Sequence, residues 1–444
     1  MQADDSRSLV SFSSLGQCHQ WDGLLQEIQA LLQESLSTAS SRRKPSVKLP
    51  TDVADRVLVG LLDVLVGGDF QTKWEAAKLL PLLEDRAIEP LLALLEDEDL
   101  EPEVHWFVVR LLGNSPTPKT LQALLTCIQT HPQEEVRAMA TQVLGGQGPP
   151  VLALVENLLQ SPLTRLQGVN ILAQIRSPQS ISQLLMLVND ANAQVRVTAI
   201  EALTLFQTPE IVPRLLQALE DPVARVRRAA LAGLTFGNLS EHPTLVPLIQ
   251  ARLWDVDIQV CCQAAVCLRR IGSPEAVTIL RSALQSSVLP DPLAIELIRS
   301  LIWIATEQSL DGVLQALDQG NLSAAVAQET LTLLGRIESP DLKPRVASWL
   351  ILRLGQGANP AIERPQLGSL DCQVMISALG QLQEPIAING LIQLLAQADT
   401  MLRLHIVAAL RQFEGVYAQL ETLANQPSSA SNLKQGLAIA LKEW

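Results

Sequence analysis

The chain has 444 residues, of which 48% are hydrophobic and only 3% aromatic, and its formal net charge is -13. This length exceeds what one ordinary hydrophobic core supports, so we expect either several domains or a repeat array. The acidic balance excludes nucleic acid as the expected partner, because we find no basic stripe in the sequence that would offset it. Abundant aliphatic residues with few aromatic ones favour helices over strands.

The sequence predicts neither a membrane span nor secretion. No stretch approaches the roughly 18 uninterrupted apolar residues of a spanning helix, and the N-terminus opens acidic without the apolar segment of a signal peptide. The cysteines form no C-x-x-C pair and are expected to be buried reduced thiols, which indicates a reducing compartment. They are Cys18, Cys127, Cys261, Cys262, Cys267 and Cys372. We therefore expect a cytoplasmic protein.

Residues 1–50 differ in composition from the rest of the chain. Most of this extension is rich in Ser and is expected to be flexible. The exception is the segment 21–36, in which Leu24, Ile28 and Leu31 recur at helical spacing. This spacing predicts one amphipathic helix that folds back onto the following array as a cap.

From residue 53 onward, a nine-residue pattern typified by VRVTAIEAL recurs eleven times at a spacing of about 31 residues. The copies begin at or near Thr72, Val104, Val136, Thr164, Val195, Val226, Val260, Leu293, Ala325, Asp371 and Leu402. Such a period is the signature of stacked helical repeats. The sequence therefore predicts an all-α protein, an α-solenoid with a right-handed superhelix built from about eleven helix pairs.

Each copy is expected to hold two helices, the first of which is the nine-residue pattern. In five copies a Ser-Pro or Thr-Pro pair follows, which caps and opens a second helix. These pairs are Thr117-Pro118, Ser177-Pro178, Thr208-Pro209, Ser273-Pro274 and Ser339-Pro340. Gly272 and Gly335 precede two of them, where a left-handed residue is expected to end the first helix. No pair buries its apolar stripe alone, so stacking should form one continuous core.

One interval is longer than the others, at 46 residues, and it divides the array. It contains a Gly- and Pro-rich stretch without helical periodicity, residues 356–369, which we expect to be an inserted loop. Repeats 1–9 then occupy residues 53–355. Repeats 10 and 11, with a C-terminal capping helix, occupy residues 370–444. The loop is either a simple insertion or a joint between these two parts.

Two copies carry a more specific motif. They read VRVTAIEALTLFQTPEIVPRLLQALED from Val195 and VCCQAAVCLRRIGSPEAVTILRSALQ from Val260. The V-R-x-x-A-x-x-A-L helix followed by a G-x-[ST]-P-E-A-[VI] turn resembles the HEAT-like repeats of the cyanobacterial phycobilisome lyase family, over about residues 70–440. The resemblance implies a concave platform that binds protein. It also implies a phycobiliprotein or another HEAT-like subunit as the partner.

Two functions are therefore open. The first is a non-catalytic protein-binding scaffold or assembly factor that uses the concave face and is linked to phycobilisomes through the family resemblance. The alternative is a subunit of a bilin lyase or isomerase, because some members of that family act in pairs to attach or remove a bilin on phycobiliproteins. Whether the protein is an enzyme depends on which function is correct.

The sequence shows no arrangement typical of catalysis or metal binding. Its histidines lie in different repeats and none precedes a Glu, which excludes the His-Glu pairs of the di-iron hydroxylases built on similar repeats. They are His19, His105, His131, His242 and His405. No Ser-His-Asp, Cys-His or G-x-S-x-G arrangement occurs. We expect no catalytic residue, no cofactor and no metal.

Several residues are candidate contacts with a protein partner. The second helices are expected to line the concave side and to present four side chains there: Gln183, Met186, Arg214 and Gln217. Arg and Met are favoured at protein contacts, although solvated polar residues would give the same pattern. Trp74 and Trp106 share one position in consecutive first helices, off the main apolar stripe. They form either an aromatic anchor for a partner or a patch that the helix over 21–36 covers.

Arginine recurs at the second position of the first helix, as Arg137, Arg165, Arg196, Arg227 and Arg403. Two of these residues follow an aspartate by six positions: Asp190 precedes Arg196, and Asp221 precedes Arg227. Arginine can bind the carboxylate of an adjacent turn through parallel hydrogen bonds. We therefore expect a structural ladder between repeats, with ligand binding as the alternative.

Overall fold

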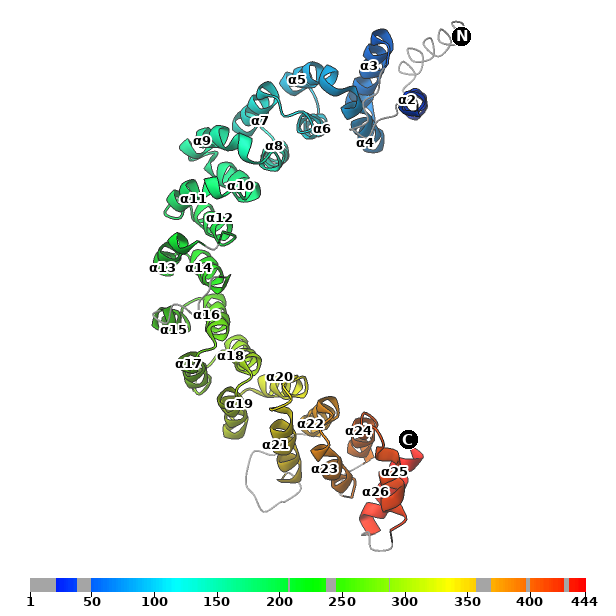
Figure 1. Cartoon of the computed structure of the whole chain (residues 1–444), viewed down its shortest axis with the longest axis vertical. Helices are drawn as coiled ribbons and strands as arrows, with labels where there is room; N and C mark the ends of the chain where they lie inside the picture. The colour runs from blue at the N-terminus through cyan, green and yellow to red at the C-terminus, as the bar shows by residue number, and fades with distance from the viewer. Residues whose placement is uncertain are drawn as a thin grey trace. The chain divides into compact units, whose positions relative to one another are not determined.

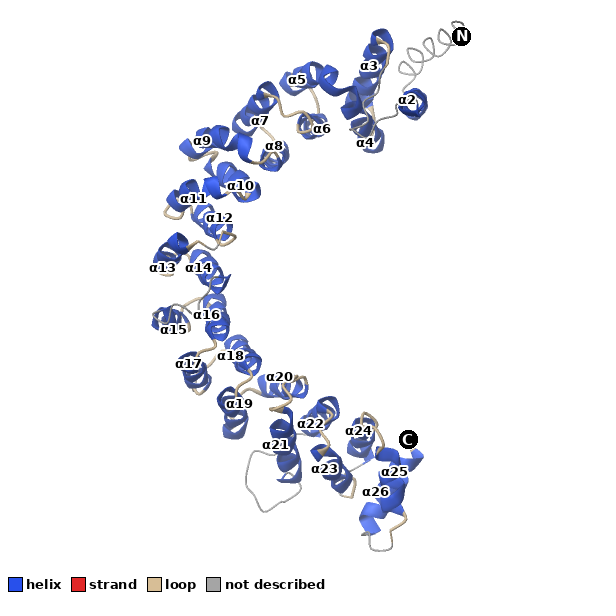
Figure 2. Cartoon of the chain, in the orientation of Figure 1, coloured by secondary structure: helices blue, strands red, loops and turns tan. Residues whose placement is uncertain are grey.

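The computed structural model describes residues 21–37, 49–206, 208–236, 245–286, 288–356, 369–396, 400–426 and 431–444. Within these ranges the chain is helical and contains no strand (Figure 2). The loop expected over 356–369 falls outside them except at its two ends, as do Cys18, His19 and His242 entirely. None of the helices described has both the length and the apolar character needed to cross a bilayer.

The contacts divide the chain into unit 1, Met1–Arg214, and unit 2, Leu215–Trp444. Unit 1 holds α2 (Trp21–Ser37), α3 (Thr51–Gly67), α4 (Phe70–Leu79), η1 (Leu80–Ala87), α5 (Ile88–Glu96), α6 (Pro102–Leu112), α7 (Pro118–Thr130), α8 (Glu134–Gly146), η2 (Pro149–Val151), α9 (Leu152–Gln160), α10 (Arg165–Ile175), η3 (Pro178–Ser180), α11 (Ile181–Leu187), α12 (Ala193–Leu203) and η4 (Pro209–Ile211). The division falls within α13 (Val212–Ala218).

Unit 2 continues the same alternation of helices. It holds α14 (Ala224–Phe236), α15 (Val246–Arg252), α16 (Ile258–Ile271), α17 (Pro274–Leu284), α18 (Asp291–Ile304), α19 (Glu307–Gln319), α20 (Ala324–Gly335), α21 (Lys343–Gln356), α22 (Ser369–Leu382), α23 (Ile386–Leu394), α24 (Thr400–Leu410), α25 (Val416–Ala424) and α26 (Ser431–Lys442). Each of the eleven sequence copies falls on an even-numbered helix from α4 to α24. The predicted all-α solenoid is confirmed.

Within each unit the helices form two rows (Figure 1). The inner row consists of the even-numbered helices, α4 to α12 in unit 1 and α14 to α24 in unit 2. The outer row consists of the odd-numbered helices between them. Most successive inner-row helices pack against one another over more residues than successive outer-row helices do. Because helices in the inner row are closer together, each unit bends toward that row.

The structure corrects the phase of the helix pair. In unit 1 each hairpin consists of an outer-row helix and the inner-row helix that follows it, since α7 packs along α8 and α9 along α10, while α8 and α9 make few contacts. In unit 2 most pairs follow the same order, but α19 packs on the preceding helix, α18. The Ser-Pro and Thr-Pro pairs therefore open a hairpin instead of dividing one. The helices that follow the Ser-Pro and Thr-Pro pairs were expected to line the concave side. This expectation was wrong, because these helices form the outer row (Figure 1). The sequence pattern identifies the helices but not which neighbour each one folds against.

Three of the five Ser-Pro or Thr-Pro pairs cap the next helix as predicted. Their hydroxyls accept hydrogen bonds from amides of the following turn at 3.2, 3.3 and 3.2 Å, in Thr117, Ser177 and Ser273 respectively. The buried hydroxyl of Thr208 has no hydrogen-bond partner among the described residues. Pro340 lies in a turn before α21 begins at Lys343.

The amphipathic segment near the N-terminus forms α2, which packs against α3 and α4. Four apolar side chains on this helix are at most 4% exposed: Leu24, Leu25, Ile28 and Leu32. Gly60 of α3 lies directly beneath them, because a Cβ at that position would be 3.4 Å from Ile28 and 3.7 Å from Leu24. The helix therefore covers apolar surface at the first pair of unit 1, the position of a cap.

Gly272 and Gly335 have different roles, although the sequence predicts the same one. Gly272 follows α16 in the left-handed conformation, with φ 60°, as expected. Gly335 is instead the last residue of α20, and a Cβ there would lie 2.8 Å from the Cα of Ala378 in α22. The prediction was wrong for Gly335, because a close approach of two inner-row helices requires glycine there, and not a positive φ.

Replacing Gly335 with Ala should force α20 and α22 apart and lower the free energy of unfolding by about 1–3 kcal/mol. Gly146 is the matched control, since it also ends an inner-row helix and a Cβ there would have no described neighbour within 4 Å. Gly146→Ala should leave stability unchanged or raise it slightly. Urea denaturation followed by circular dichroism measures both variants, and equal losses would contradict the close-approach explanation.

Candidate functional site: protein-binding surfaces and the arginine ladder

The five recurring arginines share one contact. Each donates a hydrogen bond to a main-chain carbonyl group at the end of the preceding outer-row helix. The pairs are Arg137 with His131 at 2.7 Å, Arg165 with Leu159 at 2.8 Å, Arg196 with Asp190 at 2.8 Å, Arg227 with Asp221 at 2.8 Å, and Arg403 with Leu395 at 3.3 Å. Carbonyl groups at helix ends lack partners within their own helix. The arginines therefore join the two helices of a hairpin.

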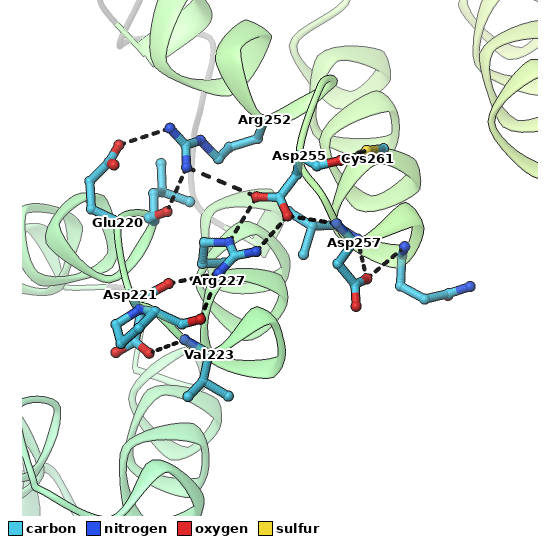
Figure 3. A network of polar contacts seen from close by, with 12 residues as sticks. Glu220, Asp221, Val223, Arg227, Arg252, Asp255, Asp257 and Cys261 are labelled. Atoms are coloured by element: carbon cyan, nitrogen blue, oxygen red, sulfur yellow. Dashed lines mark hydrogen bonds and ion pairs between the residues drawn. The ribbon is translucent and has the colours of Figure 1, made fainter. Parts of the chain in front are cut away.

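Two of these arginines also reach the next hairpin. Arg165 Nη1 lies 2.8 Å from the carboxylate of Asp190. Arg227 binds Asp255 through two hydrogen bonds, from Nε at 2.8 Å and from Nη2 at 2.5 Å (Figure 3). This parallel geometry is the strongest form of an arginine–carboxylate contact.

The two aspartates and two arginines predicted to form the ladder all take part in these contacts. The aspartates contribute a different group from the one expected. The aspartate six residues before Arg196 or Arg227 offers that arginine its main-chain carbonyl group. For Arg227, the carboxylate comes from Asp255, which lies 28 residues further along the chain. We keep the role of these contacts in holding the repeats together as a prediction.

Asp255 is the centre of the polar network in unit 2 (Figure 3). Its side chain is 4% exposed and that of Arg227 is 8% exposed. Burial alone would raise the pKa of Asp255, but hydrogen bonds from Arg227 and the Asp257 amide, with the charges of Arg227 and Arg252, lower it below the usual 3.8. The hydrogen bond with Asp255 raises the pKa of Arg227. Both side chains are therefore charged in the folded protein.

Asp255→Asn should lower the free energy of unfolding by about 3 kcal/mol, because it leaves the buried Arg227 guanidinium without its counter-charge. Glu220→Gln is the matched control. Glu220 also binds an arginine of this network, Arg252, at 3.0 Å, but its side chain is 71% exposed. An exposed pair contributes less than about 1 kcal/mol. Chemical denaturation at neutral pH compares the two, and equal effects would exclude the buried pair as an important contact.

Five cysteines lie in the described part of the chain, and none of them forms a disulfide with another described cysteine. Cys127 and Cys267 are buried in the core, and burial raises the pKa of Cys127 to about 11. Burial also raises the pKa of the half-buried Cys262 to about 11. Cys261 occupies the arginine position in α16, and its Sγ lies 3.2 Å from the Asp255 carbonyl oxygen. Thiols held protonated in this way are poor nucleophiles.

His105 of α6 and His131 after α7 form a hydrogen-bonded pair, with 3.0 Å between His131 Nε2 and His105 Nδ1. The Gln133 amide donates to His131 Nδ1 at 3.2 Å, so the proton of His131 lies on Nε2 and is donated to His105. His105 Nε2 then donates to the Asp97 carbonyl oxygen at 2.9 Å. In this arrangement the His131 ring is neutral. No group of three or more His, Cys, Asp or Glu in the described ranges is placed to hold a metal ion.

Acid should destabilise unit 1 through His131. Burial, followed by the charges of His105 and Arg137, lowers the pKa of His131 below its usual 6.5. Below pH 6.5 His131 is protonated in the unfolded chain but stays neutral in the folded chain. The free energy of unfolding therefore falls with decreasing pH until the pH reaches the folded-state pKa of His131. Urea midpoints at pH about 7.5 and about 5.5 measure the effect. His131→Gln should reduce the difference between the urea midpoints at the two pH values. An unchanged difference would show that His131 is not the group responsible.

The structure brings the two predicted tryptophans to one surface of the inner row in unit 1. Trp74 of α4 and Trp106 of α6 each pack on the buried Phe107, with ring centroids 6.2 and 5.2 Å away. The guanidinium of Arg110 lies 4.2 Å from the centre of the Trp74 ring and 5.8 Å from that of Trp106. Phe70 extends the cluster and is 55% exposed. We call Phe70, Trp74, Trp106 and Arg110 the aromatic surface.

The two alternatives for the tryptophans both stay predictions. α2 packs on α4, yet Phe70 stays exposed and Trp74 and Trp106 are half-buried. Sequence reasoning missed Phe70 and Arg110. The signal was present, because Phe70 precedes Trp74 and Arg110 follows Trp106 by four residues, the spacing that places side chains together on a helix.

The four other predicted contact residues lie on outer-row helices. Gln183 and Met186 belong to α11, where Met186 is 72% exposed and Gln183 donates to Glu156 at 3.1 Å. Arg214 and Gln217 are exposed on α13. These residues therefore lie away from the inner side where they were expected. Whether they contact a partner stays a prediction.

Comparison with known protein families identifies the repeats. The family model for HEAT repeats matches residues 58–145, 121–196, 148–235, 183–255 and 212–302, which together cover more than half of the chain. The chain belongs to the HEAT-repeat family. No curated protein has a detectably similar sequence.

Solved structures share the fold of this HEAT-repeat protein. A crystal structure of importin beta in an ammonium sulfate condition has 15% sequence identity and a TM-score of 0.51, and the match covers 97% of this chain and 64% of that one. A mutant of Kap121p has 14% identity and a TM-score of 0.48, with 98% and 55% covered. The chain thus spans less than two thirds of either protein. At this identity the likeness concerns the fold alone.

Proposed function

We propose that this HEAT-repeat protein is a non-catalytic scaffold or assembly factor that binds another protein on its inner row of helices. The observation that carries the proposal is the aromatic surface of unit 1. Tryptophan and arginine are the side chains that contribute most to protein interfaces. Here two tryptophans and an arginine lie together on adjacent helices, beside an exposed Phe70.

The aromatic surface is preformed, which favours binding. Phe107 is fully buried beneath the two tryptophan rings and fixes their positions. Arg110 lies over the ring of Trp74, so its side chain is already oriented. A partner would therefore bind without ordering these side chains first, which lowers the entropic cost. Covering the exposed Phe70 alone would contribute up to about 1.5–3 kcal/mol.

The repeat array supports the same proposal. Stacked repeats present extended surfaces, and such surfaces are what solenoid proteins use for binding. The free cysteines with raised pKa values are consistent with a protein that works in a reducing compartment such as the cytoplasm.

A Trp74→Ala/Trp106→Ala variant should lose at least about 2 kcal/mol of binding energy for its partner, a roughly 30-fold weaker Kd. Met186→Ala is the control, since it removes an exposed apolar side chain from the outer row. Affinity capture from native lysate with quantitative mass spectrometry identifies proteins retained by the wild type and by the control. The proposal fails if every such protein is also retained by the tryptophan variant, with circular dichroism showing that both variants fold.

A second candidate function rests on the V-R-x-x-A-x-x-A-L motif at Val195 and its relative at Val260. This motif resembles the repeats of the phycobilisome lyase family, in which case the protein would be a bilin lyase or isomerase subunit acting on phycobiliproteins. The partner would be a phycobiliprotein or another HEAT-like subunit. Co-expression with a bilin source and phycobiliprotein subunits tests this function through the absorbance of the product. Unchanged chromophore content would exclude it.

A further inference from the structure

Two adjacent inner-row helices of unit 2 are strongly basic. α14 carries Arg225, Arg227 and Arg228, and α16 carries Arg269 and Arg270, while neither helix contains an Asp or Glu. The two helices pack along each other. The order of residues along the chain does not reveal this grouping. The arginines are separated by about 40 positions in the sequence, and only stacking of the repeats brings them to one surface.

Two of the five arginines are neutralised by nearby carboxylates. Arg227 is paired with Asp255, and Arg269 Nη1 lies 3.6 Å from Glu296 of α18. The other three are exposed. Arg225 and Arg228 form no ion pair or hydrogen bond with any described residue. The one contact of Arg270 is a long hydrogen bond, 3.4 Å, from Nε to the Thr235 carbonyl oxygen.

The three exposed arginines lie near the two ends of α14. Arg225 and Arg228 are three residues apart at its start, which places them on one face of the helix. Arg270 reaches the Thr235 carbonyl group and therefore lies near the other end of α14. Ten residues of helix separate Arg225 from Thr235, a length of about 15 Å. We call Arg225, Arg228 and Arg270 the arginine face.

An exposed aromatic ring lies at the next helix of the inner row. Trp303 of α18 is 61% exposed, and the guanidinium of Arg269 in α16 lies 5.5 Å from the centre of its ring. α18 packs closely against α16. An apolar contact is therefore available on the helix beside the arginine face.

We propose that the arginine face binds an acidic segment of a partner protein. Guanidinium groups bind carboxylates with matched planar geometry, and these three have no carboxylate of their own in the described chain. A line of about 15 Å fits roughly five residues of extended peptide. The segment would carry Asp or Glu at several of these positions and an apolar residue that packs on Trp303.

The charge of the whole chain favours a short acidic peptide over a nucleic acid. The net charge is -13, so a long polyanion that extends beyond this face meets a chain that is acidic on balance. A peptide that covers only α14 and α16 avoids most of that repulsion. This inference rests on the proposed function, because it names the chemistry of a protein partner for a second surface.

Fluorescence anisotropy of a labelled probe peptide tests the inference with the full chain. The probe is a ten-residue peptide of Glu with one central Phe, and its control replaces every Glu with Gln. Arg225→Glu/Arg228→Glu should weaken binding of the Glu probe at least about tenfold. Binding should also weaken as salt is added, because these arginines are exposed.

The matched control is Arg56→Glu/Arg336→Glu. It makes the same change in net charge at two exposed arginines outside the arginine face, and it should leave the affinity for the Glu probe within about twofold of the wild type. Equal weakening by both double variants would show a general charge effect and overturn the proposal. Binding of the Gln probe as tight as that of the Glu probe would also overturn it.

Two further measurements complete the test. The first uses a labelled 20-nucleotide oligothymidylate. The proposal is overturned if this probe binds more tightly than the Glu probe and Arg225→Glu/Arg228→Glu weakens that binding, because the surface would then bind nucleic acid. The Trp74→Ala/Trp106→Ala variant should bind the Glu probe normally. If the arginine face does not bind the Glu probe, the proposed scaffold function still depends only on the affinity-capture result for the aromatic surface.

Discussion

The stability of this protein depends on apolar contact between neighbouring inner-row helices. No hairpin can bury its apolar stripe by itself, so each one relies on the next to complete the core. The contact is close enough that Gly335 cannot accept even a Cβ against Ala378. It also brings α14 and α16 side by side, so that arginines from different repeat positions of the two helices come close together.

Much of the fold could be predicted from the sequence, because helix formation and repeat spacing are local properties. All eleven copies fall on helices, and the segment over 21–36 forms α2. The predictions that proved wrong concerned contacts between segments that are distant in the sequence. The pattern around Thr117 marks a helix start, but nothing local shows whether that helix folds against the preceding helix or the following one. The role of Gly335 was likewise set by α22, more than 30 residues away.

The candidate sites divide in the same way. Trp74 and Trp106 could be found from their equivalent positions in consecutive helices. Their shared contacts with Phe107 and Arg110 could be seen only in the structure. The two units offer different chemistry on their inner rows. Unit 1 presents aromatic rings, and unit 2 presents guanidinium groups beside the helix that carries the exposed Trp303. A scaffold with two such surfaces can distinguish parts of its partners by composition, since each surface selects a different kind of side chain.

The five recurring arginines join the helices of a hairpin by binding main-chain oxygen atoms. Every residue type offers that oxygen, and the five acceptors are in fact a histidine, two leucines and two aspartates. Mutational tolerance should therefore be unequal across the turn. The acceptor position can drift among residue types while the hairpin keeps its bond, whereas the second position of the inner-row helix must keep a donor. Cys261 and His105 replace the arginine at that position and still reach a main-chain oxygen. Repeats can thus diverge in sequence at their turns while their geometry is retained.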